Sequence, residues 1–302
     1  MRVAVTGATG VIGAGLVGEL RARGDDPVAL SRDAARAEGQ LGVEAFEWKT
    51  PKSEPPPPGA LRGSDAVVNL LGETIAQRWS DDTKRELRDS RVLTTRNLVA
   101  GLAELPEDER PGVLVSQSAS GWYGARGDER LDEAEPAGDD FLARLTVDWE
   151  AEADKAEELG VRVVLPRTGV VLSKSGGALG KMMPFFKLGV GGPVAGGRQY
   201  VPWVHLDDVV GALLFALDND ALRGPVNVTA PEPATNKELS RTLGRVLHRP
   251  AFAPVPALAV KTLYGRMASI VITGQRAVPA RLQELGYRFR QPDLEHALRD
   301  AT

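Results

Sequence analysis

Residues 6–13 read Thr6-Gly7-Ala8-Thr9-Gly10-Val11-Ile12-Gly13, directly after an apolar run at the start of the chain and before a segment with helical periodicity. In a turn between strand and helix, Gly7 permits a tight exit from the strand. Gly10 lets the backbone approach a diphosphate, and Gly13 lets the helix pack on the sheet. The start of the helix offers free N–H groups and a partial positive charge to an anion. The stretch predicts a pyrophosphate-binding turn, with Thr9, Val11 and Ile12 also at the ligand.

Length and composition describe an ordinary globular protein. The 302 residues are 42% hydrophobic and 26% charged, which suffices for one large or two modest domains. There is no cysteine, so a disulfide framework, a thiolate zinc site and a thiol nucleophile are excluded. The net charge of −4 comes from interspersed acids and bases, without a basic stripe, and no apolar run approaches the ~20 residues of a membrane span. We expect a cytoplasmic protein with a small-molecule substrate, and neither nucleic acid nor a membrane as partner.

Strand and helix patterns alternate through the first two-thirds of the chain, which predicts a doubly wound parallel α/β sheet of the Rossmann type. Expected strands are Pro27 to Leu30, Val43 to Trp48, Ala66 to Leu70, Val113 to Val115 and Val161 to Leu165, and expected helices are 80–103 and 139–159. Thr235-Asn236-Lys237-Glu238 is a capping-box pattern that marks the start of a later helix. We expect a dinucleotide-binding domain over residues 1–230 and a smaller, partly helical C-terminal region over 231–302.

Two glycine-rich stretches, Lys174 to Gly180 and Gly189 to Gly197, lie within residues 174–200 of the first domain. Flexible glycines beside a sheet edge commonly form a lid or a substrate wall. In that arrangement Lys174, Lys181 or Arg198 could meet an anionic substrate. A simple disordered loop fits the same composition equally well.

The end of the second expected strand, Leu30-Ser31-Arg32-Asp33, bears on which dinucleotide binds. An acidic residue at this place usually holds a free ribose 2′-hydroxyl, whereas an arginine accommodates a 2′-phosphate. Ser31 can donate to a phosphate oxygen, and Arg32 can form a bidentate, charge-assisted pair with it. NADP is therefore favoured, while Asp33 keeps NAD, and with it a conventional NAD-dependent epimerase, open.

Several motifs occur in the order found in one protein group: Thr6 to Gly13, Ser31-Arg32, Asn69 to Glu73, Ser118 to Gly124, Asp148 to Glu150, Arg167 to Leu172 and Trp203 to Asp208. With these motifs the chain resembles the epimerase-family group of atypical short-chain dehydrogenase/reductases, relatives of the extended sugar-nucleotide epimerases with a C-terminal segment of their own. The resemblance covers nearly the whole chain, including the closing stretch Pro279 to Gln283.

The resemblance also implies further cofactor contacts. Leu70 and Leu71 would lie against the adenosine half, next to Gly72, where the fourth strand ends. Glu86 and Arg91 would face the cofactor from the following helix, and Val171 would line the nicotinamide side. These segments fall at the carboxyl ends of the strands, where an open α/β sheet binds its ligands. For Glu86 a solvated ion pair on the helix surface is the alternative.

The chemistry departs from the family pattern. Ordinary short-chain dehydrogenase/reductases use a Tyr-x-x-x-Lys pair, in which the tyrosine moves a proton and the lysine lowers its pKa. The residues four places after Tyr123, Tyr200, Tyr264 and Tyr287 are Gly127, Val204, Ala268 and Gln291, so no such pair exists. An unassisted tyrosine with a pKa of ~10 is only ~0.1% ionised at pH 7. The usual proton relay is absent.

The remaining candidates for chemistry lie after the strand at Val113. Tyr123 and Ser118 are the expected catalytic residues, Tyr123 as proton donor or substrate contact and Ser118 as the family-typical hydroxyl. A packing role for the tyrosine is equally compatible with its neighbours. Asp148 or Glu150 could act as general base if buried, and Arg167 is expected to anchor structure.

His205 lies just before Asp207 and Asp208, where it fits a packed residue at a helix start better than a metal ligand, so we predict no metal site. Two hypotheses follow for the whole chain. The first is an NADP-dependent oxidoreductase or epimerase-like enzyme acting on a small hydroxyl or carbonyl compound. The second is an NADPH-binding sensor or partner-binding protein with little or no turnover.

Overall fold

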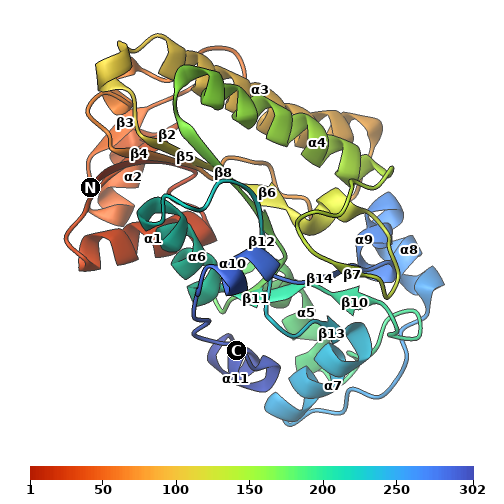
Figure 1. Ribbon diagram of the computed structural model, residues 1–302. Helices are drawn as coiled ribbons and strands as arrows, with labels where there is room; N and C mark the ends of the chain where they lie inside the picture. Colours follow the sequence, from red (N-terminus) through yellow and green to blue (C-terminus); the bar gives the residue numbers. More distant parts are fainter.

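A computed structural model describes residues 1–302, with one large parallel sheet at the centre of the molecule (Figure 1). Its main strands are β1 (Arg2–Thr6), β2 (Asp26–Ser31), β3 (Ala45–Glu47), β4 (Ala66–Asn69), β5 (Val113–Ser116), β8 (Arg162–Thr168) and β12 (Gly224–Val228). They lie in the order β12-β8-β5-β4-β1-β2-β3, and the short β6 (Ser118–Ala119) also pairs with β8. Every one of these pairings is parallel. The expected Rossmann-like α/β sheet is confirmed.

Helices cover both faces of this sheet. They are α1 (Val11–Ala22), α2 (Ala34–Leu41), α3 (Asp81–Ala103), α4 (Phe141–Asp154) and α6 (Leu206–Asp218). Figure 1 shows α3 and α4 side by side on one face and α1 and α6 on the other. Alternate strand residues serve the two layers: Val3 and Val5 belong to the core beneath α1 and α6, whereas Ala4 belongs to the core beneath α3 and α4.

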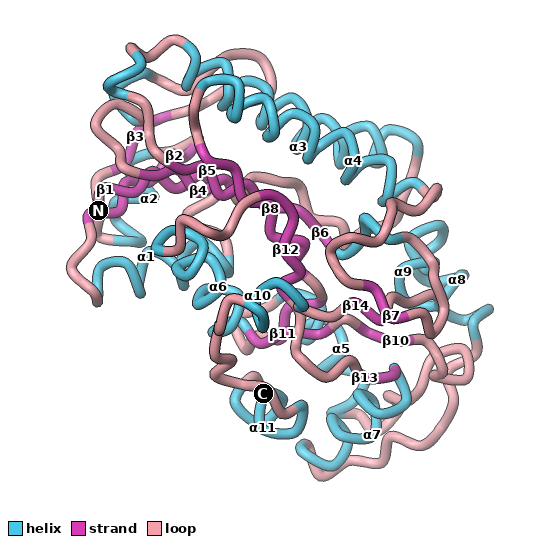
Figure 2. The backbone as a smooth tube through the Cα atoms, in the orientation of Figure 1, coloured by secondary structure: helices cyan, strands magenta, loops and turns pink.

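A smaller lobe follows the main sheet and is built around three two-stranded pairs (Figure 2). β9 (Val170–Leu172) pairs with β11 (Trp203–His205), β10 (Tyr200–Val201) with β13 (Ala234–Thr235), and β7 (Arg130–Leu131) with β14 (Arg276–Ala277). The remaining α-helices are α5 (Gly177–Lys187), α7 (Asn236–Val246), α8 (Ala257–Tyr264), α9 (Ala268–Ile272), α10 (Ala280–Glu284) and α11 (Leu294–Asp300), of which α10 packs against β12 of the main sheet. Two of the pairs join residues before position 230 to residues after it, so the lobe combines chain from both sides of that position.

Short 3-10 helices complete the fold: η1 (Pro58–Ala60), η2 (Glu107–Glu109), η3 (Ser120–Tyr123), η4 (Lys155–Leu159) and η5 (Gly265–Met267). No helix has both the length and the apolar character that a membrane crossing requires.

Local sequence signals place several helix starts correctly. The side chain of Ser80 accepts from the Thr83 N–H at the start of α3, and Thr235 and Glu238 form the complete capping box of α7. By contrast, α5 begins at Gly177, within a stretch expected to be loop. Burial of Leu179 in the core of the smaller lobe outweighs the low helix propensity of the glycines around it.

The end of the chain is tied to α6 by the buried carboxylate of Asp208. Its two oxygens accept hydrogen bonds from the backbone N–H groups of Arg290, at 2.6 Å, and Gln291, at 2.9 Å. The Tyr287 hydroxyl contacts the same carboxylate at 3.3 Å. This single side chain therefore positions the segment that leads into α11.

Candidate functional site

The glycine turn lies between β1 and α1, at the carboxyl end of β1, an interior strand of the sheet. Gly7 has φ +66°, and a Cβ at this position would lie 2.8 Å from the carbonyl oxygen of Leu70. A Cβ at Gly13 would lie 2.3 Å from the carbonyl oxygen of Gly7. Both positions therefore require glycine, the first for its backbone conformation and the second for the close approach of α1 to the turn.

The start of α1 presents unused hydrogen-bond donors. Its N-cap is Gly10, which has extended backbone and no side chain to cap the helix. The backbone N–H groups of Val11, Ile12 and Gly13 have no acceptor within the protein. Thr9 and Gly10 are exposed, and Val11 and Ile12 are half-buried. An anion placed beside Gly10 would meet these three donors and the positive end of the helix dipole.

The end of β2 places Arg32 and Asp33 in different roles. Arg32 is exposed and makes no hydrogen bond or ion pair with the rest of the chain. Asp33 is the N-cap of α2, and its carboxylate accepts the N–H of Arg36 at 2.9 Å. The Ser31 hydroxyl oxygen accepts the N–H of Asp33 at 3.2 Å. The acidic residue is therefore used by its own helix, while the guanidinium is free to meet a ligand.

The loop after β4 forms the next wall of this edge. Leu70 and Leu71 are half-buried and pack against opposite layers of the core, and Gly72 is exposed. Beneath them, the buried Asn69 side chain accepts from the Thr6 hydroxyl at 2.7 Å and donates to Ser116 at 3.1 Å. This bond network fixes the ends of β1, β4 and β5 relative to one another.

Arg91 reaches the same loop from α3. Its guanidinium is 7% exposed and donates to the carbonyl oxygens of Leu87, at 3.0 Å, and Glu73, at 2.8 Å. Burial lowers the pKa of Arg91 to about 10, because no carboxylate hydrogen-bonds to the cation. A Cβ at Gly72 would lie 2.9 Å from its Cζ atom. The structure thus brings an unneutralised positive charge directly under the Gly72 backbone.

Glu86, expected at the cofactor on the same helix, forms an ion pair with Lys52, whose Nζ lies 2.8 Å from the carboxylate. Both side chains are more than 40% exposed. The geometry matches the solvated surface pair that the sequence also allowed, and such pairs contribute little to stability.

Val171 lies in β9, and the glycine-rich segment after it crosses the carboxyl edge of the sheet. A Cβ at Gly176 would come within 3.9 Å of a Val11 side-chain methyl, and one at Gly177 within 3.7 Å of the Val171 carbonyl oxygen. Farther along α5, the Nζ atom of Lys181 donates to the carbonyl oxygen of Ala76, in the loop after β4. The segment therefore covers the space between the glycine turn and that loop, as a lid would.

Tyr123 does not lie where a substrate could reach it. Its side chain is 0% exposed, and its hydroxyl donates to Asn227 Oδ1 at 2.7 Å and accepts from Arg167 Nη1 at 3.4 Å. Burial raises the pKa of Tyr123 to about 12, because the phenolate would be poorly solvated. The expectation that Tyr123 contacts substrate is corrected: the tyrosine is a packed residue whose hydroxyl is already used.

Ser118 belongs to the same buried network. It is 1% exposed, and its hydroxyl donates to Glu150 Oε1. The carboxylate of Glu150 in turn accepts two hydrogen bonds from Arg167, each at 2.9 Å. The expected catalytic role of Ser118 is corrected for the same reason as that of Tyr123, because burial and a committed hydroxyl leave it no access to a ligand. Arg167 anchors structure, as expected.

The two carboxylates considered as general bases differ in burial and in their partners. Glu150 is buried but engaged by Arg167, and Asp148 is exposed and paired with Arg88 at 2.9 Å. Hydrogen bonds and the charge of Glu150 raise the pKa of Arg167, although burial alone would lower it. Arg167 therefore occupies both oxygens of the Glu150 carboxylate, which is not free to contact a substrate.

The second glycine-rich stretch is ordered by hydrogen bonds to α7. The Val194 N–H donates to Asn236 Oδ1 at 2.7 Å, and the Lys237 N–H donates to the Gly197 carbonyl oxygen at 3.0 Å. Beyond it, Arg198, Lys237 and Tyr200 are among the residues that line a hollow of about 650 Å³. Lys174 is exposed on the first glycine-rich stretch, so the three cations singled out in the sequence lie at separate places.

His205 is buried at the start of α6. Its Nδ1 atom accepts the Asp207 N–H at 3.2 Å, and Nε2 lies 3.2 Å from the carboxylate of Asp300. Both ring nitrogens therefore face partners within the protein, in a cluster of His205, Asp207 and Asp300.

Comparison with known proteins gives the family. Residues 3–229 match the NAD dependent epimerase/dehydratase family, and residues 255–301 match the Domain of unknown function (DUF1731). The chain belongs to the NAD dependent epimerase/dehydratase family. It is 42% identical to "Epimerase family protein SDR39U1 homolog, chloroplastic" of Arabidopsis thaliana, over 99% of this chain and 86% of that protein. It is 35% identical to "Epimerase family protein YfhF" of Bacillus subtilis, over 99% and 97%.

A solved structure gives the same fold along the whole chain. The crystal structure of the human epimerase family protein SDR39U1 (isoform 2) with NADPH superimposes with a TM-score of 0.88 at 35% identity, covering 100% of this chain and 99% of that one. The chain is thus similar to SDR39U1-type members of the epimerase family.

Two contacts described above could not be predicted from the sequence. The pairing of Glu150 with Arg167 joins a helix to a strand, and the contact of Lys181 with Ala76 joins segments 105 residues apart. For the pair of Glu150 with Arg167, the one hint in the sequence is a Glu on a helix that lacks Tyr-x-x-x-Lys. No local sequence pattern predicts the contact of Lys181 with Ala76.

Proposed function

We propose that this protein binds NADP(H) along the carboxyl edge of its sheet. The main observation behind this proposal concerns the two residues after β2. Asp33 caps α2, whereas the guanidinium of Arg32 makes no hydrogen bond or ion pair within the chain. A 2′-phosphate needs such a guanidinium, whereas a bare ribose would need the carboxylate. The human relative that was crystallised with NADPH supports the same proposal.

The residues at this edge of the sheet each contact a different part of the cofactor. Gly7, Thr9, Gly10, Val11, Ile12 and Gly13 hold the diphosphate, the last three with their free N–H groups. Ser31 and Arg32 hold the 2′-phosphate, Leu70, Leu71 and Gly72 face the adenosine half, and Val171 lies at the nicotinamide side. Arg91 lies against the Gly72 backbone and adds positive charge.

We further propose that the protein is an oxidoreductase or epimerase-like enzyme acting on a small hydroxyl or carbonyl compound. When bound, NADP(H) supplies or accepts the hydride. Reduction of a carbonyl then consumes NADPH, the carbonyl compound and one proton, and gives NADP⁺ and the alcohol. Because Ser118 and Tyr123 are buried and engaged, the proton comes from solvent water rather than from those hydroxyls.

A second candidate is an NADPH-binding protein with little or no turnover, acting as a sensor or for a partner. The observation that favours it is the closed network of Ser118, Glu150, Arg167 and Tyr123, which occupies the place of the family's proton relay. A general acid or base typically contributes 10²–10⁴-fold to rate, so its loss can silence an enzyme without affecting cofactor binding.

Single-turnover kinetics distinguishes the two. The protein is first loaded with NADPH, with one dinucleotide per chain verified by native mass spectrometry. It is then mixed with a library of aldehydes, ketones and keto-sugars, while the absorbance of the reduced nicotinamide is followed. A substrate-dependent loss of absorbance supports the enzyme. Tight binding with no oxidation above the protein-free rate overturns it and leaves the sensor.

The variant Tyr123→Phe sharpens this test. Because the hydroxyl faces Asn227 and not the cleft, we expect an unchanged oxidation rate and a lower melting temperature. A rate loss of 10²-fold or more with unchanged stability would restore Tyr123 as proton donor.

A further inference from the structure

Two long segments of this acidic protein contain no acidic residue. The chain as a whole has 41 Asp and Glu residues and 37 Lys and Arg residues. In residues 159–206 and 239–283, however, every residue of these four types is Lys or Arg. The two segments meet in space: Val194 forms a bridge with Val255, and the Val255 N–H donates to the Pro193 carbonyl oxygen at 2.8 Å. The smaller lobe therefore carries a local positive charge on a molecule of net negative charge.

The same place exposes large apolar side chains. Leu188 is 78% exposed, Phe252 77%, Val190 60% and Phe185 43%. Hydrogen bonding and packing bring their two segments together, since Arg249 Nε donates to the Lys187 carbonyl oxygen at 3.1 Å and a Cβ at Gly189 would lie 3.5 Å from Pro250. These side chains are exposed to solvent at the surface of the smaller lobe, and Phe252 also lies at the edge of a hollow.

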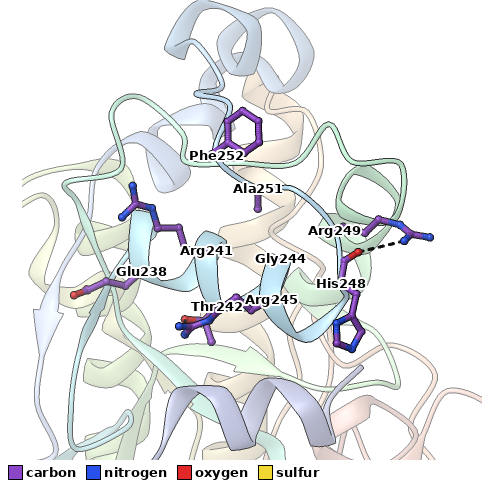
Figure 3. A pocket seen from close by; sticks show the side chains of 9 residues that line it. All are labelled: Glu238, Arg241, Thr242, Gly244, Arg245, His248, Arg249, Ala251 and Phe252. Carbon is purple, nitrogen blue, oxygen red and sulfur yellow. Dashed lines mark hydrogen bonds between the residues drawn. The ribbon is translucent and has the colours of Figure 1, made fainter.

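Between these apolar side chains and α7 lies a basic hollow of about 690 Å³. Figure 3 shows Arg241, Arg245, His248 and Arg249 around it, with Phe252 on the opposite side from α7. Arg241 is exposed and has no partner, and Arg245 shares its charge with Glu295 at 3.1 Å. The one acid of the lining, Glu238, is already used in the α7 capping box.

We propose that this surface, which we call the C-terminal patch (Phe185, Lys187, Leu188, Val190, Arg241, Arg245, His248, Arg249 and Phe252), docks on a bilayer rich in anionic phospholipid. The exposed apolar side chains enter the interface between headgroups and acyl chains, and the basic hollow receives a headgroup phosphate. Exposed apolar side chains among cations suit a bilayer, which yields around them, whereas a protein partner would need a matching cavity for each.

This proposal departs from the expectation that a membrane is no partner. That expectation concerned a spanning segment, and the structure has none. Docking of a folded surface needs only several exposed apolar side chains and a favourable charge, and it leaves the cofactor edge as described.

Vesicle flotation of the full-length protein tests the proposal. Vesicles of phosphatidylcholine alone are compared with vesicles that also contain phosphatidylglycerol, at low and high salt. We expect binding only to the anionic vesicles, weakened by salt because exposed charges are screened. The Arg241→Gln/Lys187→Gln double variant removes two cations whose side chains make no hydrogen bond or ion pair within the chain. At the typical gain per surface cation it should bind roughly thirtyfold more weakly.

The apolar contribution is tested by Leu188→Ser/Phe252→Ser. Its matched control is Val147→Ser, which removes an exposed apolar side chain from α4, and the control for the cations is Arg85→Gln on α3. Both controls should bind vesicles like wild type, and all variants should keep their NADPH affinity. Equal binding by the patch variants and the controls would overturn the proposal. Failure of the wild-type protein to bind either kind of vesicle would also overturn it. The same holds if the patch variants change only the self-association of the protein, measured by analytical ultracentrifugation.

Discussion

The guanidinium of Arg167 donates to both oxygens of the Glu150 carboxylate, from Nε and Nη2, at 2.9 Å each. Both side chains are buried, and the Arg167 Cζ atom lies 3.8 Å from the centroid of the Trp122 ring. This pair joins α4 to β8, and the chain contains no Tyr-x-x-x-Lys pair.

Breaking this pair should destabilise the fold strongly. In Glu150→Gln the Arg167 cation stays buried with a weaker partner, and loss of one partner of a buried pair costs roughly 3–5 kcal/mol. Chemical denaturation measures the change. The matched control is Arg88→Gln, which breaks an exposed pair with Asp148 on the same helix and should cost less than about 1 kcal/mol. Equal effects of the two variants would contradict the structural role of Glu150.

The neighbouring carboxyl group of Glu133 predicts a pH dependence. Burial raises the pKa of Glu133, although backbone N–H groups of Asn227 and Arg281 bind one oxygen and oppose the shift. The native state thus keeps this proton to a higher pH than the unfolded chain does. Its contribution to stability is greatest below the ordinary carboxyl pKa and falls as pH rises through the raised value. Wild type should therefore lose stability relative to Glu133→Gln across this window, in paired denaturation curves. A pH-independent difference would disprove it.

Gly10 has extended backbone that any residue can adopt, and a Cβ there would lie 3.2 Å from the Gly7 carbonyl oxygen, a milder contact than the 2.3 Å at Gly13. In Gly10→Ala we expect a loss of stability of no more than about 1 kcal/mol, but at least tenfold weaker NADPH binding. The methyl group would stand where the diphosphate approaches. Gly18→Ala, farther along α1 in open space, is the control and should raise stability by up to ~1 kcal/mol without affecting binding. Unchanged affinity in Gly10→Ala would remove the diphosphate from this turn.

Asp208 predicts a local effect at the end of the chain. In Asp208→Asn one of the two oxygens that accept the Arg290 and Gln291 N–H groups becomes an NH₂ donor. A buried N–H left without an acceptor costs about 1–3 kcal/mol. Hydrogen exchange should therefore accelerate in residues 287–302, with β1 and β4 unchanged. Uniform acceleration over the whole chain would mean that this segment does not open separately.

The parts of the fold that could be predicted from the sequence are those with local causes. Gly7 and Gly13 predict the first turn, and Ser80 and Thr235 predict the starts of two helices. Apolar runs predict the strands β1, β4, β5 and β8. The two-residue strands of the smaller lobe have no period to detect, and they form only because distant segments such as 130–131 and 276–277 meet.

The site divides in the same way. The cofactor edge follows from residues next to each other in sequence, such as Arg32 and Asp33, although only the structure shows that Asp33 is used as a cap. The catalytic expectation failed because burial is a tertiary property. Ser118 and Tyr123 lie close together in the sequence, but Glu150 and Asn227, which their hydroxyls contact, lie far along the chain.

The central claim is that Arg32 selects the 2′-phosphate, and isothermal titration calorimetry with NADPH and NADH measures this directly. Wild type should bind NADPH at least tenfold more tightly than NADH, since charge-assisted pairs contribute about 1.5–3 kcal/mol. Arg32→Gln should lose that preference with NADH binding unchanged, whereas Arg85→Gln should keep it. Equal affinities for the two dinucleotides in wild type, or no heat with either, would contradict the account.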